Sequence, residues 1–249
     1  MRSWTVVGLM LLAGCAGQTG SNGSGSFDQG LRDRARIHTE LGSGYFAQGQ
    51  MAIALEEFNE AVSADPSYSL SYNGLGLVYG NLHEDVKAEA SFKRSIELEP
   101  SNPESHNNYG TFLCARNRID ESIMQFMEAV KNPLYASPGV AYLNAGVCSL
   151  KKQDAKNAEL YFRNALQAQP NLHAAAYQLA LIAFNRGDHL LARGYLLNAM
   201  ADNPKPEMFW LGVRVERVLG DQDAEASYTL LLKNKYPDSE QTKALLSGQ

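Results

Sequence analysis

The sequence predicts an all-α fold, a right-handed superhelix of about six helix–turn–helix repeats. Two observations lead to this prediction. One set of five residue types occurs twice with identical internal spacing, as Gly42, Tyr45, Ala54, Phe58 and Pro66, and again as Gly76, Tyr79, Ala88, Phe92 and Pro100. The pattern continues further along the chain through Gly110 and Phe126, and then through Gly146 and Phe162.

A 34-residue period with Gly, Tyr, Ala, Phe and Pro at these offsets is the tetratricopeptide signature. Each unit is a pair of helices that packs on its neighbours. Small residues allow the two helices to cross closely, the aromatic residues fill the space between them, and proline ends the second helix. The domain is expected over 28–249, with repeats near 35–68, 69–102, 103–136, 139–172, 173–206 and 207–240.

Two places depart from the strict period. The step from Gly110 to Gly146 is longer than the regular one, so two extra residues are expected in the proline-bracketed connector 132–138. Repeat 6 is degenerate: Trp210 takes its first aromatic position, and Arg214 takes the position where glycine is expected. Such drift is typical of a terminal repeat, and Ser239 is expected to cap a short final helix.

Composition restricts the function. The 249 residues carry a net charge of −5 with both signs mixed and no basic block, so a nucleic-acid partner is not expected. The sequence has no HExxH, GxSxG, CxxC or phosphate-binding glycine motif. The five histidines are scattered, and packing explains His38 and His106 better than metal binding does. We therefore expect no enzyme activity, metal or cofactor.

The N-terminus has the pattern of a bacterial lipoprotein. Residues 1–14 read as a signal peptide, with Arg2 before a short apolar run. The sequence Leu-Ala-Gly-Cys that ends at Cys15 resembles a lipobox, which implies that Cys15 carries lipid; the alternative is an ordinary signal peptide with an incidental cysteine. By the same resemblance, Ala16 after the cysteine implies an outer-membrane anchor that faces the periplasm. Residues 15–27 are rich in Gly and Ser and are expected to form a flexible tether.

Tetratricopeptide proteins bind partners on the inner wall, the surface formed by the first helices of the repeats. Its expected residues are mixed in repeats 1–3 and apolar in repeats 4–6, where the wall is either an open groove or covered by the superhelix itself. A groove near the tether suits a peptide, so the candidate partner-binding residues are Phe46, Leu70, Asn73 and Leu77. A clamp for a terminal carboxylate is not supported, because the corresponding positions carry no positive charge.

Three stretches are more specific than the repeat. They are His106 to Gly110, Pro133 to Tyr135, and Leu211 to Pro237. In these the chain resembles the PilF/PilW-type pilotins, outer-membrane lipoproteins of type IV pilus biogenesis and stability. The resemblance implies a protein that binds secretin subunits and promotes their localisation and assembly in the outer membrane. The alternative is a general periplasmic adaptor lipoprotein for cell-envelope or peptidoglycan machinery.

Two cysteines remain once Cys15 is assigned to lipid. Cys114 and Cys148 lie on the expected first helices of repeats 3 and 4, which stack. Helix axes about 8–10 Å apart bring facing Cα atoms into the range of a disulfide. The periplasm is oxidising, and the resemblance to pilotins also implies a bridge between these repeats. The alternative is a pair of buried thiols.

Overall fold

The computed structural model describes the backbone of residues 22–248 and the side chains of residues 28–248. Over this range the chain forms helices joined by short turns and has no strand, which confirms the all-α tetratricopeptide fold. The helices are α1 (Asn22–Ala47), α2 (Met51–Ala64), α3 (Ser69–Asn81), α4 (Asp85–Leu98), α5 (Pro103–Ala115), α6 (Ile119–Ala129), α7 (Pro138–Lys151), α8 (Ala155–Ala168), α9 (His173–Arg186), α10 (His189–Ala199), α11 (Pro206–Leu219), α12 (Gln222–Lys235) and α13 (Glu240–Leu246).

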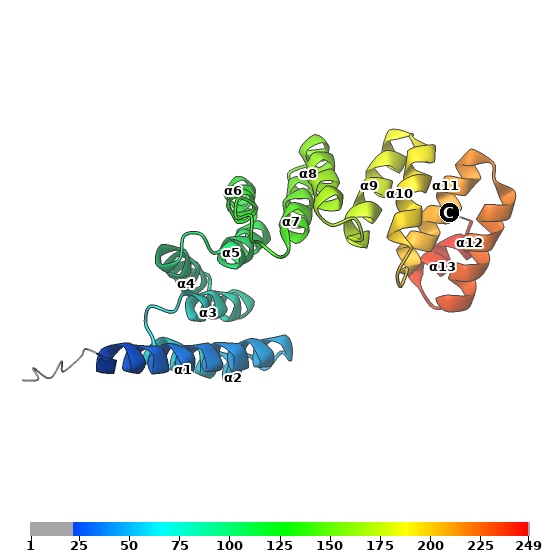
Figure 1. The fold of residues 1–249 in the computed structure, drawn as a ribbon. Coiled ribbons are helices and arrows are strands. Elements are labelled where there is room, and N and C mark those ends of the chain that lie inside the picture. The colour runs from blue at the N-terminus through cyan, green and yellow to red at the C-terminus, as the bar shows by residue number, and fades with distance from the viewer. Residues whose placement is uncertain (1–21, 249) are drawn as a thin grey trace, which may run out of the picture.

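Consecutive helices pack in pairs, and the pairs stack along an arc that runs from α1 to α13 (Figure 1). The first helices of repeats 1–4 also contact one another, α1 with α3, α3 with α5 and α5 with α7, so that they form one continuous inner wall. The short helix α13 contacts α11 and α12 and covers the end of the last repeat. The stack therefore offers an extended surface rather than a closed cavity.

The repeated Gly and Phe residues meet inside each of the first four repeats. The ring in each repeat is buried against the glycine of the preceding helix, in the pairs Gly42 and Phe58, Gly76 and Phe92, Gly110 and Phe126, and Gly146 and Phe162. A Cβ atom on Gly146 would lie 2.5 Å from the ring of Phe162. The repeated glycine therefore allows the two helices of a repeat to approach closely, because only glycine leaves room for the phenylalanine ring.

Replacing Gly146 by alanine is expected to destabilise the fold by about 1–3 kcal/mol, because the new methyl group overlaps a ring that cannot move away. Gly194 on helix α10 is the matched control, since nothing lies within 4 Å of a Cβ placed there. Gly194→Ala should raise stability by up to about 1 kcal/mol through helix propensity. Urea unfolding followed by circular dichroism measures both variants. Equal stability of Gly146→Ala and wild type would contradict this packing.

The turn between the two helices of each repeat uses one residue with positive φ. These residues are Gly49, His83, Asn117, Gln153, Gly187 and Gly220, with φ values between 59° and 87°. Glycine and asparagine adopt this left-handed conformation at little cost. The left-handed backbone of His83 is therefore the one that every repeat has at this turn, and no bound ligand is needed to explain it.

Repeat 6 differs from the predicted register. Gly212, and not Arg214, takes the glycine position, because a Cβ on Gly212 would lie 2.8 Å from the ring of Tyr228. Gly212 and Tyr228 have the same spacing in the chain as the glycine and phenylalanine of the first four repeats. The step from Ala180 to Gly212 is two residues shorter than the regular period. The prediction was wrong because it aligned Trp210 with the first aromatic position.

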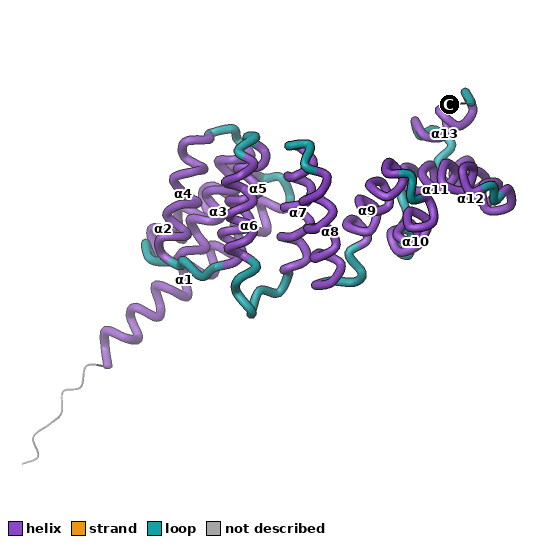
Figure 2. The backbone as a smooth tube through the Cα atoms, turned by 90° about the horizontal axis from the view of Figure 1, so that it is seen from above, coloured by secondary structure: helices purple, strands orange, loops and turns teal. Residues whose placement is uncertain are grey.

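The N-terminal end of the described chain also differs from the prediction. Helix α1 begins at Asn22, within the segment expected to be a flexible tether, and extends beyond the packed repeats (Figure 2). Helical hydrogen bonds are local, so a helix stabilised by packing on α2 can continue past the packed part. The tether prediction therefore applies only before Asn22, and Cys15 and the signal peptide lie outside the described residues. No helix in the described range is long and apolar enough to cross a membrane.

Candidate functional site

Two adjoining hollows lie on the inner wall of repeats 1–4, and we call them together the groove. The first, about 240 Å³, is lined by Phe46, Gly76, Leu77, Gly80, Asn81, Phe92, Asn108, Thr111, Phe112, Ala115 and Arg116. The second, about 190 Å³, is lined by Thr111, Cys114, Ala115, Phe126, Asn144, Val147 and Lys151. They share Thr111 and Ala115 on α5, so the groove crosses the four stacked first helices α1, α3, α5 and α7. Its floor is apolar, and amides and cations stand at its sides.

The structure divides the four predicted groove residues into two pairs. Phe46 and Leu77 line the first hollow. Leu70 is half-buried but lines neither hollow, and Asn73 is only 8% exposed and accepts a hydrogen bond from Asn108. The prediction for Leu70 and Asn73 as groove residues is therefore not supported. Asn73 faces the neighbouring first helix, α5, rather than solvent.

The prediction missed several groove residues on α5 and α7. Arg116 and Lys151 lie at the C-terminal ends of these helices, and Asn108 and Asn144 lie near their middles. Asparagine recurs at 108 and 144 with the same spacing as Gly110 and Gly146, and this was a usable signal. The cations carried no such signal, because their role depends on partners in other repeats.

The apolar wall of repeats 4–6 is open in part. In repeat 6, Met208, Leu211 and Val215 are buried in one core cluster with repeat 5, so this part of the wall is covered. The register shift explains this, because it turns these three residues into the space between repeats. In repeats 4 and 5, Leu143, Leu150 and Leu181 are half-buried, and Arg214 lies over the ring of Phe184 at 4.5 Å. The groove of repeats 1–4 is therefore the stronger candidate site.

Cys114 and Cys148 lie opposite each other at the second hollow. Their Cα atoms are 5.9 Å apart, within the range that a disulfide requires. Cys148 is fully buried, and Cys114 lines the hollow. The bond itself stays a prediction, and the geometry fits it. A bridge here would fix the spacing of α5 and α7 beneath the groove.

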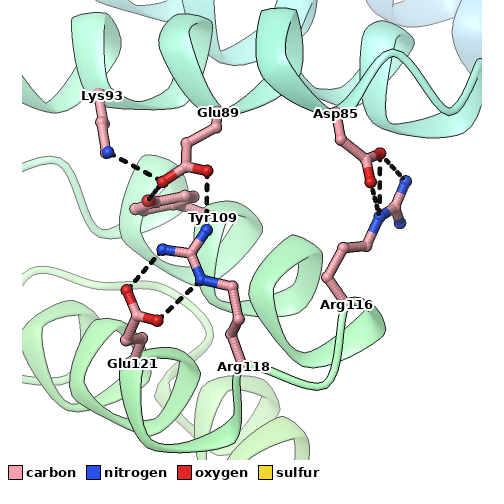
Figure 3. A network of polar contacts seen from close by, with 7 residues as sticks. All are labelled: Asp85, Glu89, Lys93, Tyr109, Arg116, Arg118 and Glu121. Atoms are coloured by element: carbon pink, nitrogen blue, oxygen red, sulfur yellow. Dashed lines mark hydrogen bonds and ion pairs between the residues drawn. The ribbon is translucent and has the colours of Figure 1, made fainter.

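A polar network joins repeats 2 and 3 beside the groove (Figure 3). Glu89 on α4 accepts hydrogen bonds from Arg118 at 2.7 Å and from the Tyr109 hydroxyl at 3.0 Å, and it pairs with Lys93 at 2.9 Å. Arg118 also binds Glu121 through two nitrogens. The bond from Arg118, followed by that from Lys93, lowers the pKa of Glu89 to about 2. Burial, aided by Glu89, raises the pKa of Tyr109 to about 12.

Glu89→Gln is expected to lower stability at neutral pH by about 1 kcal/mol, because the side chain is 25% exposed and solvent screens its charge pairs. The folded-state pKa lies below the ordinary value of 4.5, so this contribution is present above pH 4.5 and is lost as the pH falls toward about 2. Urea titrations at pH 7 and pH 3 measure the difference. Glu97→Gln, at an exposed pair with Arg94, is the control and should change little. A pH-independent effect of Glu89→Gln would contradict the ionic role.

His38 and His106 form contacts that hold neighbouring parts of a repeat together. His38 contacts the carboxylate of Glu57 at 2.7 Å, and His106 lies between Gln125 at 2.7 Å and the Pro100 carbonyl at 2.9 Å. The contacts with Glu57 and Gln125 join the two helices of a repeat. In the part of the chain that the structure describes, no three His, Cys, Asp or Glu residues are grouped so as to hold a metal ion.

Comparison with known proteins agrees with this architecture. Family models of the tetratricopeptide repeat match residues 35–68, 70–102 and 140–172, and a second such model matches 91–124. The type IV pilus assembly protein PilF of Pseudomonas aeruginosa is 30% identical over 230 residues, which cover 92% of this chain and 90% of PilF.

Two solved structures are similar over nearly their whole length. The structure from the functional characterisation of Pseudomonas aeruginosa PilF has a TM-score of 0.79 at 26% identity and covers 88% of this chain and all of that one. PilW, described as a widely conserved type IV pilus biogenesis factor, has a TM-score of 0.72 at 30% identity and covers 85% of this chain and 98% of PilW. The chain therefore belongs to the tetratricopeptide-repeat proteins of type IV pilus biogenesis, the family of PilF and PilW.

Proposed function

We propose that this chain is a non-enzymatic pilotin, which binds subunits of the type IV pilus secretin and promotes their localisation and assembly in the outer membrane. The observation that carries the proposal is the groove on the inner wall of repeats 1–4, in a chain that matches 90% of PilF in sequence and has a similar fold. An apolar floor with polar sides suits a peptide segment of a partner protein. The groove offers no group of residues arranged for catalysis.

Assembly in the living cell tests this function. A strain that lacks the protein should lose secretin multimers from its outer-membrane fraction, and the wild-type gene should restore them. Affinity capture from envelope extracts separates the alternative, a general adaptor lipoprotein: secretin should dominate for a pilotin, and cell-wall enzymes for an adaptor. Normal secretin multimers in the deletion strain would contradict the proposal.

The proposed mechanism is targeting by an anchor. Lipid on Cys15 would hold the protein at the inner surface of the outer membrane, and more than one acyl chain is what stable anchoring requires. The groove would then bring the bound subunit to that membrane. The first repeats follow the anchor in the chain, so the groove would lie near the membrane as well.

Cys15→Ala is expected to leave the precursor unprocessed or to move the protein out of the outer-membrane fraction, because lipid attachment needs the thiol. Membrane fractionation with immunoblotting measures this, with the wild-type protein as the control. Unchanged outer-membrane recovery of Cys15→Ala would refute the lipoprotein assignment.

A further inference from the structure

Four asparagines on the first helices of repeats 2–4 form one hydrogen-bonded chain. Asn144 donates to Asn107 at 3.1 Å, Asn107 donates to Asn108 at 3.4 Å, and Asn108 donates to Asn73 at 3.3 Å. The row crosses α7, α5 and α3 along the inner wall. Side-chain amides that bind one another across three repeats hold a fixed orientation, so they present preformed polar groups to the groove.

The members of this chain differ in exposure. Asn73 and Asn107 are each only 8% exposed, whereas Asn108 and Asn144 are half-buried and line the first and second hollows. Asn144 uses one N–H for Asn107, and within the described residues its other N–H and its Oδ1 have no partner. An amide with a free donor beside a free acceptor is complementary to a main-chain peptide unit, which offers one of each.

A positive charge stands at the same hollow. Lys151 donates to the Cys114 carbonyl at 3.3 Å, which leaves two of its three donors for a ligand. Among the described residues no carboxylate forms an ion pair with Lys151. Arg116 in the first hollow differs, because it binds Asp85 through two nitrogens (Figure 3). One of these nitrogens also donates to the Gly80 carbonyl. The second hollow therefore has a cation that is available to an anionic group.

On these observations we propose that the groove binds an extended, acidic segment of the secretin subunit. Asn144 pairs with a main-chain peptide unit of the segment, and Lys151 pairs with a carboxylate on it. An apolar side chain of the segment fills the first hollow between Leu77 and Phe112. This inference rests on the proposed function and adds the conformation and charge of the ligand.

The amides favour an extended ligand over a helical one. A helix satisfies its main-chain N–H and C=O groups internally, so its interior residues have nothing to offer Asn144. An extended segment leaves both groups free until it is bound. The unpaired ammonium favours an acidic segment over a basic one, since Lys151 would repel a second cation.

Peptide binding tests this inference. Overlapping short peptides that cover the periplasmic part of the secretin from the same genome are titrated against the mature protein by fluorescence anisotropy. For the tightest peptide, Asn144→Ala should weaken binding by about 3- to 10-fold through the lost hydrogen bonds. Lys151→Gln should weaken it by about 2- to 5-fold at low salt and less at high salt, where charges are screened. The matched controls are Asn59→Ala and Lys156→Gln, which are exposed on second helices.

An N-methyl scan of that peptide identifies the main-chain contact. Methylation at one position should weaken binding to wild type but not to Asn144→Ala, because in that variant the peptide N–H has already lost its partner on the protein. Wild-type affinity of both groove variants would overturn the inference while the proposed function stands. Binding of the folded subunit but of none of its peptides would overturn it equally. Failure of both the subunit and its peptides to bind would refute the proposed function itself.

Discussion

Replacing both Cys114 and Cys148 by alanine is expected to lower the free energy of unfolding by about 3–4 kcal/mol. The bridge would close a loop of 34 residues, and the chain-entropy model assigns a stabilisation of this size to such a loop. The two residues also join α5 to α7 across the irregular connector 130–137, where the regular repeat spacing is interrupted. Urea unfolding of the oxidised protein and of the double variant measures the loss.

Reduction of the wild-type protein provides the control, because it opens the bridge and keeps both side chains in place. Reduced wild type should lose most of the same stability, and any further loss in the double variant reports the packing of the buried Cys148 side chain. Mass spectrometry of periplasmic protein alkylated without reduction gives the covalent state directly. Two alkylated thiols in the mature chain would contradict the bridge.

Leu77→Glu is expected to weaken binding of the secretin subunit by about 30-fold or more, since a charge placed in an apolar hollow must be desolvated when the partner binds. Leu77 lines the first hollow with Phe46 and Phe112. Helicity should be retained, because the side chain faces the inner wall and is only half-buried. Titration calorimetry with the purified subunit measures affinity, and circular dichroism measures folding.

Two variants show whether the effect is local to the groove. Leu190→Glu, on the second helix of repeat 5 and 70% exposed, should leave binding unchanged. Thr111→Arg, at one of the two exposed residues that both hollows share, should weaken binding without entering the core. Loss of helicity in Leu77→Glu together with normal binding by Thr111→Arg would identify Leu77 as a core residue and place the partner elsewhere.

Most of the fold could be predicted because it is periodic. The contact between each repeated glycine and its phenylalanine recurs at a fixed spacing, so residue types alone locate the helix pairs of repeats 1–4. Repeat 6 could not be aligned in the same way, since Tyr228 replaces phenylalanine and the step before it is two residues short. The regular glycine-to-ring spacing of Gly212 and Tyr228 was present in the sequence and is a better guide than Trp210.

The candidate site was predictable only in part. A repeat position tells which helix face a residue lies on, and this sufficed for Phe46 and Leu77. It does not tell whether a side chain faces the groove or the next repeat, and so Asn73 was misplaced. The availability of Lys151 and the pairing of Arg116 depend on carboxylates in other elements, such as Asp85, which lies 31 residues from Arg116. Such pairings arise from the packing of repeats and leave no local pattern in the sequence.

Site-specific photo-crosslinking in living cells tests the central claim, that the groove binds the secretin subunit. A photoreactive amino acid is placed at position 77 in the groove or at position 190 on the outer face. Both variants are expressed at the level of the wild-type protein, so that their crosslinks can be compared. We predict a crosslink to secretin from position 77 and none from position 190. A secretin crosslink from position 190 alone, or from neither position in cells that assemble pili, would contradict the claim.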